Sequence, residues 1–557
     1  MTFLTDEVMA GTDWRGLELA VVRLLSHCGW KNVQDVGKSG DKGADILAVH
    51  PGVKNRKSDT YLIQVKAISG GSYVGITAIN QALQGQGHYK TRVTVVATNG
   101  DFTKSALKRR DELREEGFDV RLWNGAFLTK LLENWPQYPS DRKEPRSYQD
   151  KIVQKILSNF DNGRGKSLFI VATGLGKTVI ASTASNLLMA QGLKKILVLC
   201  HSTDLAQQLQ KEFWNQIPKS VPTRIFMDGD APIPVDGINF GLYQTLHGYL
   251  GGIDSDAFDL VIVDEAHHAL ANAFATCMEH LKPKFLIGMT ATPWRGDGAL
   301  IDSIFGDPIY RVSLVDGMKM GYLSRVDYRL ICDNINWEEI PKLAKKTVSV
   351  RDLNKRLFLP QRDDAVVKNL MTVMKEFSNP RIAIFSPSIS HAESFARQLN
   401  ARRIPAANAS ISDKIKRRSI LMDFTVGRLT ALTSVDVLNE GIDVPDLNIL
   451  VFLRATHSRR IFVQQLGRGL RLALGKDKVV VLDYVTDIRR LAAVAGLDRE
   501  AKEERKTGEI ETVYLSDGVV SFSDKRTQGF VDAWLEDVAS LEDTEEAEKL
   551  TFPEAFS

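Results

Sequence analysis

The stretch SLFIVATGLGKT, Ser167–Thr178, decides the fold of the central part of the chain. A short apolar run, typical of a buried strand, leads into a glycine-rich turn, and a helical pattern follows. Glycines in such a turn let backbone N–H groups surround phosphate oxygens, and the N-terminus of the next helix favours an anion. The turn therefore predicts a nucleotide phosphate site formed by Thr173, Gly174, Gly176 and Lys177, with the Thr178 hydroxyl as a ligand of Mg²⁺.

The same alternation of apolar strand, turn and helix recurs around this stretch. It continues in KKILVLCHSTDLAQQ, FDLVIVDEAHH and KFLIGMTATP, and it resumes in PRIAIFSPS, RLTALTSVD, LNILVFLRA and DKVVVLDYV. Short, nearly continuous apolar strands bounded by helices indicate parallel sheets covered on both faces. We therefore expect an α/β protein with two such sheets in tandem, in residues 146–325 and 365–495, joined by a less regular connecting segment, 326–364.

A second feature of the first sheet is the acidic pair in FDLVIVDEAHH. Asp264 and Glu265 follow a buried strand, where one carboxylate can hold Mg²⁺ and its neighbour can polarise an attacking water. The alternative is that these acids only cap a helix. A zinc site at His267 and His268 is disfavoured, because adjacent histidines lack ligand spacing.

Composition sets the broad class. Formal net charge is only +3, so nucleic-acid binding must come from local basic surfaces. Four cysteines without a Cys-x-x-Cys pair fit a reduced cytoplasm and disfavour a zinc site. No run approaches the roughly 18 apolar residues of a membrane span, and the acidic start does not look like a signal peptide, so we expect a cytoplasmic protein without membrane contact.

The front of the chain holds another group of polar residues. TDWRGLELAVVRLLSHCGW predicts an amphipathic helix with Glu18 beside its apolar face. Asp45 begins a strand in GDKGADILAV, and Gln64 and Lys66 share one face of the strand TYLIQVKA because side chains alternate along a strand. If the two strands pair, Asp45 approaches that face, where carboxylate oxygens can hold Mg²⁺ and a lysine can steady an oxyanion.

Residues 145–490 resemble superfamily two helicases of the DEAH-box type, in the branch near restriction-enzyme and repair translocases. The motifs appear in the family's order: Tyr148–Gln149, the phosphate turn, DEAH at Asp264–His267, Thr290–Pro293, SVDVLNEGIDVP and QQLGRGLR. The family's phosphate turn is commonly A-x-x-G-x-G-K-T, which fits Val171 here. The resemblance implies two RecA-like domains that bind and hydrolyse ATP. It also implies roles for Gln149 at adenine, for Gly441 and Asp443 at nucleotide and nucleic acid, and for Arg468 and Arg471 as arginine fingers.

Residues 12–133 resemble Mrr-type restriction endonucleases of the PD-(D/E)xK fold. The helix with Glu18, the G-D-x-G-A-D run and the Q-x-K run carry this resemblance. It implies a catalytic set of Asp45, Gln64, Lys66 and Glu18, with Asp45 as a metal ligand. Gln64 replaces the usual acid, a common variant in this family. Because it leaves one fewer charged ligand, a domain that binds DNA without cutting it stays open.

The resulting interpretation is a DNA translocase fused to a DNA endonuclease, with ATP and Mg²⁺ as cofactors and a restriction or anti-phage role that can include a partner protein. The rivals are a repair helicase whose front domain only binds DNA, and an RNA-remodelling helicase. Basic residues near 414–418 can be a solvated helix face or phosphate contacts, and the acidic end can be a solvated tail or a docking element. The expected regions are 1–135 (endonuclease-like), 136–145 (linker), 146–325 (first RecA-like domain), 326–364 (connection), 365–495 (second RecA-like domain) and 496–557 (C-terminal extension).

Overall fold

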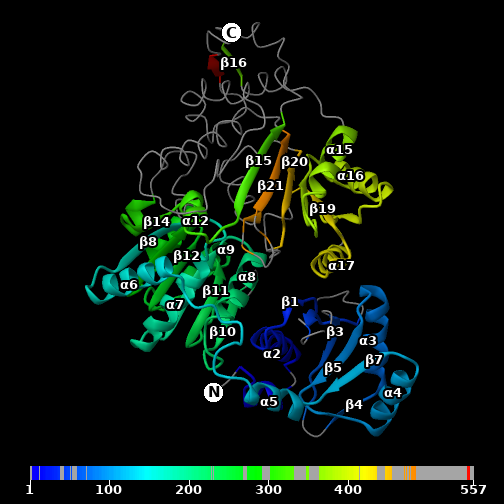
Figure 1. Cartoon of the computed structure of the whole chain (residues 1–557). Coiled ribbons are helices and arrows are strands. Elements are labelled where there is room, and N and C mark those ends of the chain that lie inside the picture. Colours follow the sequence, from blue (N-terminus) through cyan, green and yellow to red (C-terminus); the bar gives the residue numbers. More distant parts are fainter. Residues whose placement is uncertain are drawn as a thin grey trace.

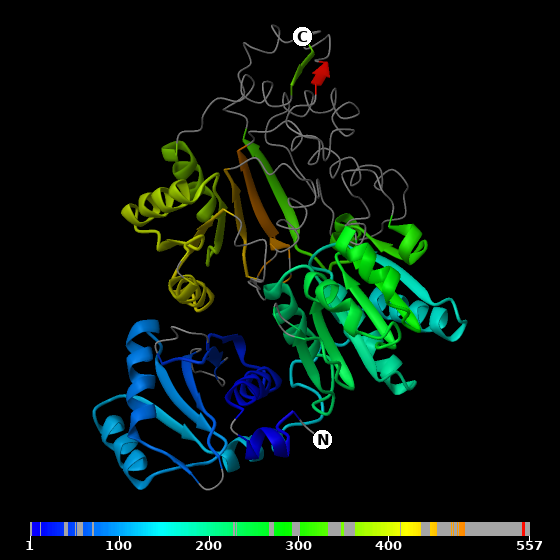
Figure 2. The same cartoon turned by 180° about the vertical axis from the view of Figure 1, so that it is seen from behind.

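The structure is a computed structural model of the 557-residue chain. It describes residues 3–11, 13–37, 43–50, 52, 59–69, 72–226, 229, 231–266, 272–291, 301–331, 347–349, 363–412, 414–435, 446–453, 469–470, 472, 476, 478–484 and 549–551. Three sheets dominate the described part, one in the front region and two farther along the chain (Figures 1 and 2).

The front domain is built on a five-stranded sheet in the order β1-β2-β3-β5-β7. Its strands are β1 (Lys31–Asp35), β2 (Ile46–His50), β3 (Asp59–Lys66), β5 (Val93–Thr98) and β7 (Asp119–Trp123), and a short pair is formed by β4 (Tyr73–Val74) and β6 (Asp101–Phe102). Helices α2 (Trp14–His27) and α5 (Gly125–Asn134) pack on one face of the sheet, and α3 (Ile76–Tyr89) and α4 (Lys104–Glu115) pack on the other. A short helix, α1 (Asp6–Ala10), precedes α2.

Residues 146–325, the first RecA-like domain that the helicase resemblance implies and called the first motor domain below, contain a seven-stranded sheet, β10-β11-β9-β12-β13-β8-β14. Every described strand pair in this sheet is parallel. The strands are β8 (Lys166–Val171), β9 (Lys195–Cys200), β10 (Thr223–Phe226), β11 (Gly237–Leu242), β12 (Leu260–Asp264), β13 (Phe285–Thr290) and β14 (Pro308–Val312). One face is covered by α6 (Ser147–Asp161), α7 (Lys177–Ala190) and α8 (Thr203–Trp214). The other is covered by α9 (Tyr243–Tyr249), α10 (Asn272–His280) and α11 (Asp302–Phe305), with η1 (Leu250–Gly252) and α12 (Leu314–Lys319) nearby in the chain.

The second motor domain holds a six-stranded sheet, β15-β21-β20-β17-β19-β18, which is also parallel throughout its described pairs. Its strands are β15 (Arg325–Ile331), β17 (Ile382–Phe385), β18 (Ala406–Asn408), β19 (Ala431–Ser434), β20 (Ile449–Phe452) and β21 (Lys478–Tyr484). Its helices are α15 (Asp363–Met374), α16 (Ile389–Ala401) and α17 (Lys414–Thr425), and β16 (Thr347–Ser349) pairs with β22 (Lys549–Thr551). The two parallel sheets confirm the α/β fold predicted from the strand pattern.

Strand β15 is the edge strand of this second sheet, at the start of the stretch that the pattern indicates as a connection. Its sequence, RVDYRLI, alternates charged and apolar residues, as an edge strand does when one face is solvated. The search for continuous apolar runs therefore did not predict this strand. Arg329 pairs with Asp327 at 2.6 Å and with Glu376 at 2.7 Å, so the charged side of the strand is held by ion pairs.

Candidate active sites

Asp45 lies at the centre of the front-domain site. It directly precedes β2, and only 7% of its surface is exposed. Its Oδ2 accepts a hydrogen bond from the backbone N–H of Val65 in the neighbouring strand, at 2.6 Å. One carboxylate oxygen is therefore part of the hydrogen bonding of the sheet, which fixes the direction of the side chain.

Gln64 and Lys66 lie on the same face of β3, the face covered by α3. Gln64 is 4% exposed. When its amide is oriented so that the nitrogen donates to the Ala78 carbonyl at 2.7 Å, its oxygen accepts from Lys66 Nζ at 3.1 Å. The side chain of Gln81, on α3, is 3.3 Å from the same amide. The amide thus aligns the lysine ammonium along the strand face.

Glu18 reaches the site from α2 and is 3% exposed. Its Oε2 is 3.0 Å from Arg15 Nη1, and Arg15 is held in turn by Asp35 at 2.7 Å. A Cβ at Gly37 would lie only 3.0 Å from both carboxylate oxygens of Glu18, so the glycine lets this carboxylate pack closely against the backbone. Gly43 is needed for a different reason: its φ is +87°, and a Cβ there would lie 2.1 Å from the Gln81 carbonyl oxygen.

The electrostatics of the front site fit a divalent cation. Burial and the charge of Asp45 raise the pKa of Glu18 to about 8, against the opposing effect of Arg15. Two carboxylates that repel each other in a buried place are stabilised by a cation between them. No group of three or more His, Cys, Asp or Glu side chains in the described part of the chain is arranged for a metal. Two carboxylates suit Mg²⁺, which usually takes one or two and keeps several waters.

The phosphate turn lies between the end of β8 and the first residue of α7, Lys177. Gly174 and Gly176 have φ values of 87° and 80°, the left-handed region in which glycine costs nothing. The Thr173 hydroxyl in this turn is buried and has no hydrogen-bond partner among the residues that the structure describes. An unpaired buried hydroxyl is costly, so the turn has a polar group that a bound phosphate can satisfy.

The acidic pair lies beside this turn, because β12 and β8 both flank β13. Lys177 Nζ is 3.6 Å from Glu265 Oε1, and the Thr290 hydroxyl donates to Glu265 Oε2 at 3.4 Å. Glu265 has a φ of 49°, which is strained for this residue type and common at functional sites. Burial and the neighbouring Glu265 carboxylate raise the pKa of Asp264, so its charged form requires a nearby cation.

Gln149, at the start of α6, is packed against the phosphate turn. Its Nε2 donates to the Leu175 carbonyl at 2.8 Å, and its Oε1 accepts from the backbone N–H of Arg146 at 2.8 Å. The Tyr148 hydroxyl donates to the same Leu175 carbonyl. A Cβ at Gly176 would lie 2.6 Å from Gln149 Nε2. Tyr148 and Gln149 therefore both hold the phosphate turn in place through the Leu175 carbonyl.

Several predicted residues lie outside the described residues: Gly441, Asp443, Arg468 and Arg471, together with His267, Thr292 and Pro293. Their roles stay predictions. The helicase resemblance also implies contacts to a nucleic-acid backbone from HSTDL (His201–Leu205) and from Gln244–Thr245. Ser202 is the N-cap of α8, and Thr245 is buried in α9. The side chains of Lys414 and Arg418 are likewise not described, whereas Lys416 is exposed.

Sequence reasoning missed Arg15 and Gln81. Arg15 precedes Glu18 by three residues, a spacing that places two helical side chains side by side, so this partner could have been found. Gln81 could not, because only tertiary packing brings α3 against the strand that carries Gln64.

Three protein families match separate parts of the chain. Residues 9–132 match the family described as restriction endonuclease (Mrr_cat), residues 142–295 match the res subunit of type III restriction enzymes, and residues 364–473 match the helicase conserved C-terminal domain. The chain joins an Mrr-type restriction endonuclease domain to a superfamily two helicase core. This confirms the family assignment predicted from the motifs, and the helicase core consists of the two motor domains described above.

Individual relatives of this nuclease–helicase fusion are distant. IRC3 of Saccharomyces cerevisiae, a candidate ATP-dependent helicase, is 25% identical over 354 residues, 61% of this chain and 51% of its own length. The endonuclease subunit of the type I restriction enzyme EcoAI of Escherichia coli is 25% identical over 406 residues, 65% of this chain and 49% of its own. The chain thus spans about half the length of these curated relatives.

A solved structure supports the fold of the whole fusion. The type ISP restriction-modification enzyme LlaBIII bound to DNA has a TM-score of 0.52 at 17% identity, covering 97% of this chain and 42% of its own. No helix in the described part of the fusion is both long and apolar enough to cross a membrane.

Proposed function

We propose that this chain is an ATP-dependent DNA translocase fused to a Mg²⁺-dependent DNA endonuclease, and that it acts as a restriction or anti-phage effector in the cytoplasm. The observation that carries the proposal is the presence of two separate sites in one chain. The Lys177–Glu265 pair lies at the phosphate turn, and Asp45 lies with Gln64 and Lys66 on one face of the front sheet.

The helicase core would use ATP in the following way. Lys177 and the backbone of the turn hold the phosphates, Thr178 and Asp264 hold Mg²⁺, and Glu265 polarises the attacking water. Glu265 is suited to this because Lys177 and Thr290 already fix its carboxylate. We assign Arg468 and Arg471 to the transition-state charge, Gly441 and Asp443 to the nucleotide from the second domain, and Gln149 to the adenine end of the site. Because both domains supply catalytic groups, ATP binding closes the cleft between the two domains.

The front domain would cut DNA with Asp45, Glu18, Gln64 and Lys66. Asp45 and Glu18 supply carboxylates for Mg²⁺, and the ion, when bound, polarises a phosphate oxygen and activates a water. Lys66, aligned by the Gln64 amide, steadies the negative charge that develops on the phosphate. The amide oxygen at position 64 can still serve as a neutral ligand.

The proposed partners are DNA and, for the defence role, a protein of the same system. Similarity to an endonuclease subunit of a type I restriction enzyme, and a fold shared with a DNA-bound restriction-modification enzyme, support DNA over RNA. A subunit-like relative also favours assembly with other proteins.

Purified protein should be incubated with supercoiled plasmids in different modification states, with and without ATP and Mg²⁺. We expect cleavage that requires Mg²⁺ and disappears in Lys66→Ala, and ATPase activity that disappears in Lys177→Ala. Lys108→Ala, an exposed lysine on α4, is the matched control and should cut normally. DNA-stimulated ATPase without cleavage of any plasmid would favour the repair helicase, and stimulation by RNA alone would favour the RNA-remodelling helicase.

A further inference from the structure

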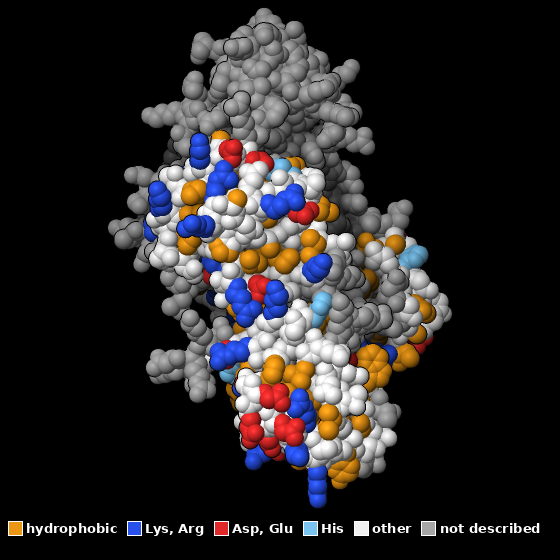
Figure 3. Space-filling model, turned by 90° about the vertical axis from the view of Figure 1, so that its right-hand side faces the viewer, with side chains coloured by type: hydrophobic (Ala, Val, Ile, Leu, Met, Phe, Trp, Pro, Cys, Tyr) orange, Lys and Arg blue, Asp and Glu red, His pale blue; other side chains and the backbone are white. Residues whose placement is uncertain are grey.

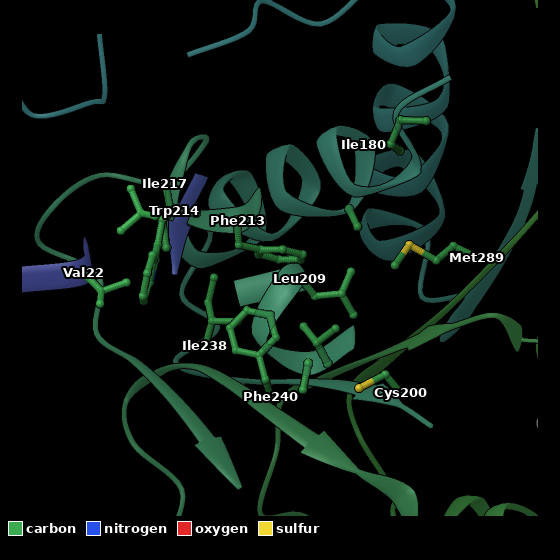
Figure 4. Close-up of a cluster of buried hydrophobic side chains, with 14 of the residues drawn as sticks. Val22, Ile180, Cys200, Leu209, Phe213, Trp214, Ile217, Ile238, Phe240 and Met289 are labelled. Carbon is green, nitrogen blue, oxygen red and sulfur yellow. The ribbon is translucent and has the colours of Figure 1, made fainter. Parts of the chain in front are cut away.

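The helix that carries Glu18 also fastens the front domain to the first motor domain. Arg23, on α2, is 4% exposed, and its guanidinium donates to the carbonyls of Val221 at 2.8 Å and Pro218 at 3.3 Å. It also lies over the ring of Trp214, at the end of α8. Figure 4 shows the neighbouring Val22 directed at Trp214. The apolar core is therefore continuous from α2 into the motor domain.

The segment after the front domain strengthens this attachment. His27 Nε2 lies 2.9 Å from the Pro136 carbonyl oxygen, and Lys219 Nζ donates to the Trp135 carbonyl at 2.9 Å. The Tyr138 hydroxyl is 3.1 Å from the amide of Asn186, on α7. Residues expected to form a linker are thus hydrogen-bonded on both sides, and this segment adds to the attachment between the nuclease domain and the first motor domain.

The front domain has a second contact, with α17 of the second motor domain. Met422 is 2% exposed and belongs to an apolar cluster whose other buried members all come from the front domain. Val426 packs against the same cluster. The Asn32 amide donates to the Thr425 hydroxyl at 2.5 Å. Figure 1 shows α17 facing the front domain. Figure 3 shows Lys and Arg side chains where the front domain meets the second motor domain.

This second contact lies on the α3 face of the front sheet. The cluster includes Leu47 and Leu62, which alternate along their strands with residues that face α2. By the same alternation Asp45 and Gln64 belong to the α3 face. Ala44, directly before Asp45, is a member of the cluster too. Helix α17 therefore joins the apolar cluster that contains Ala44, the neighbour of Asp45, whereas α3 covers Gln64 on the same face.

The two contacts differ in strength among the described residues. The α2 contact combines a buried guanidinium, several hydrogen bonds and a continuous core, whereas the α17 contact consists of two apolar side chains and one side-chain hydrogen bond. We therefore expect that a movement of the two motor domains relative to each other breaks the weaker contact first and leaves the nuclease domain attached to the first motor domain.

We propose that α17 is a movable cover on the front-domain surface beside Asp45, and that it is released when ATP and DNA close the motor cleft. The partner of this front-domain surface is thus a helix of the same chain, and release frees the surface at Asn32 and Ala44, next to Asp45, for the approach of DNA. The proposal rests on the proposed translocase and nuclease functions.

Cross-linking tests the movement without any need for DNA cleavage. Asn32→Cys with Thr425→Cys places two thiols at the contact, and each single variant is the control. Because Asn32 has a φ of 48°, chemical denaturation of its single variant checks the fold of the front domain. With oxidised glutathione added as the oxidant, we expect the disulfide to form readily without nucleotide and at least about tenfold more slowly with DNA and ATP on a Glu265→Gln background. An equal rate in both states overturns the cover.

A charge at Met422 tests the consequence for cleavage. Met422→Asp should open the cover, because a carboxylate is disfavoured in an apolar contact, and should raise plasmid nicking without ATP by about tenfold or more. Arg428→Ala, an exposed residue just after α17, is the matched control and should change nothing. If Met422→Asp folds, hydrolyses ATP normally and still needs ATP for nicking, the cover is refuted. Nucleotide-dependent cross-linking without cleavage of any DNA would refute only the nuclease function.

Discussion

Replacing Asp45 by asparagine and by alanine separates its structural role from its catalytic one. The buried carboxylate accepts a hydrogen bond from the Val65 N–H at 2.6 Å. Asparagine keeps an oxygen for this bond, whereas alanine leaves a buried N–H without its acceptor, at a cost of about 1–3 kcal/mol. We therefore expect Asp45→Ala to lower the free energy of unfolding of the front domain by this amount, and Asp45→Asn to lower it by clearly less.

Both variants should lose DNA cleavage, because both lose the charge that holds Mg²⁺. Loss of a residue that only hydrogen-bonds a metal ligand typically lowers metal affinity or activity about 10–100-fold, and loss of the ligand itself should lower it more. Cleavage should therefore fall by at least about 100-fold while DNA-stimulated ATPase continues. The pKa of Glu18, which the charge of Asp45 helps to raise, should fall in Asp45→Asn.

The assays are chemical denaturation, ATPase and plasmid nicking across a range of Mg²⁺ concentrations, all on the same preparations. The reasoning fails if Asp45→Asn nicks DNA like the unmutated protein at any Mg²⁺ concentration. It also fails if Asp45→Ala is as stable as Asp45→Asn, since the Val65 hydrogen bond would then contribute nothing.

Three further predictions concern charged groups. Glu265→Gln should bind ATP but slow its hydrolysis about 10²–10⁴-fold, as measured by single-turnover ATPase, and near-normal turnover would exclude Glu265 as the base. Arg471→Ala should slow hydrolysis by about 10³-fold or more with little change in nucleotide affinity, and an affinity collapse at an unchanged rate would make it a binding residue. For Glu18, burial raises the pKa of the folded state to about 8 from 4.5, so the folded protein binds more protons between these values. The stability that Glu18 contributes to the metal-free front domain should be fully present below pH 4.5 and be lost as pH rises toward 8, and Mg²⁺ binding near pH 7 should release a proton. Unfolding in chelator at several pH values should therefore differ in slope between the unmutated protein and Glu18→Gln, which lacks this contribution.

The sequence by itself determined the parts of the molecule that depend on neighbouring residues. The phosphate turn is a strand, a glycine turn and a helix within twelve residues, so its geometry follows from local backbone preferences. The alternation along β3 likewise fixes Gln64 and Lys66 to one face without any knowledge of the fold. Runs of buried strand residues predicted both parallel sheets for the same reason.

Only the tertiary structure decided how these parts meet. β15 is a strand of the second sheet because it pairs at seven positions with β21, which lies about 150 residues later in the chain. Arg23 looks like one more charged residue on an amphipathic helix, yet its acceptors, the carbonyls of Val221 and Pro218, come from residues nearly 200 positions away. A helix pattern shows which face is apolar but not what covers that face. The attachment of the nuclease to one motor domain, and its contact with the other, therefore depend on long-range packing that no local pattern encodes.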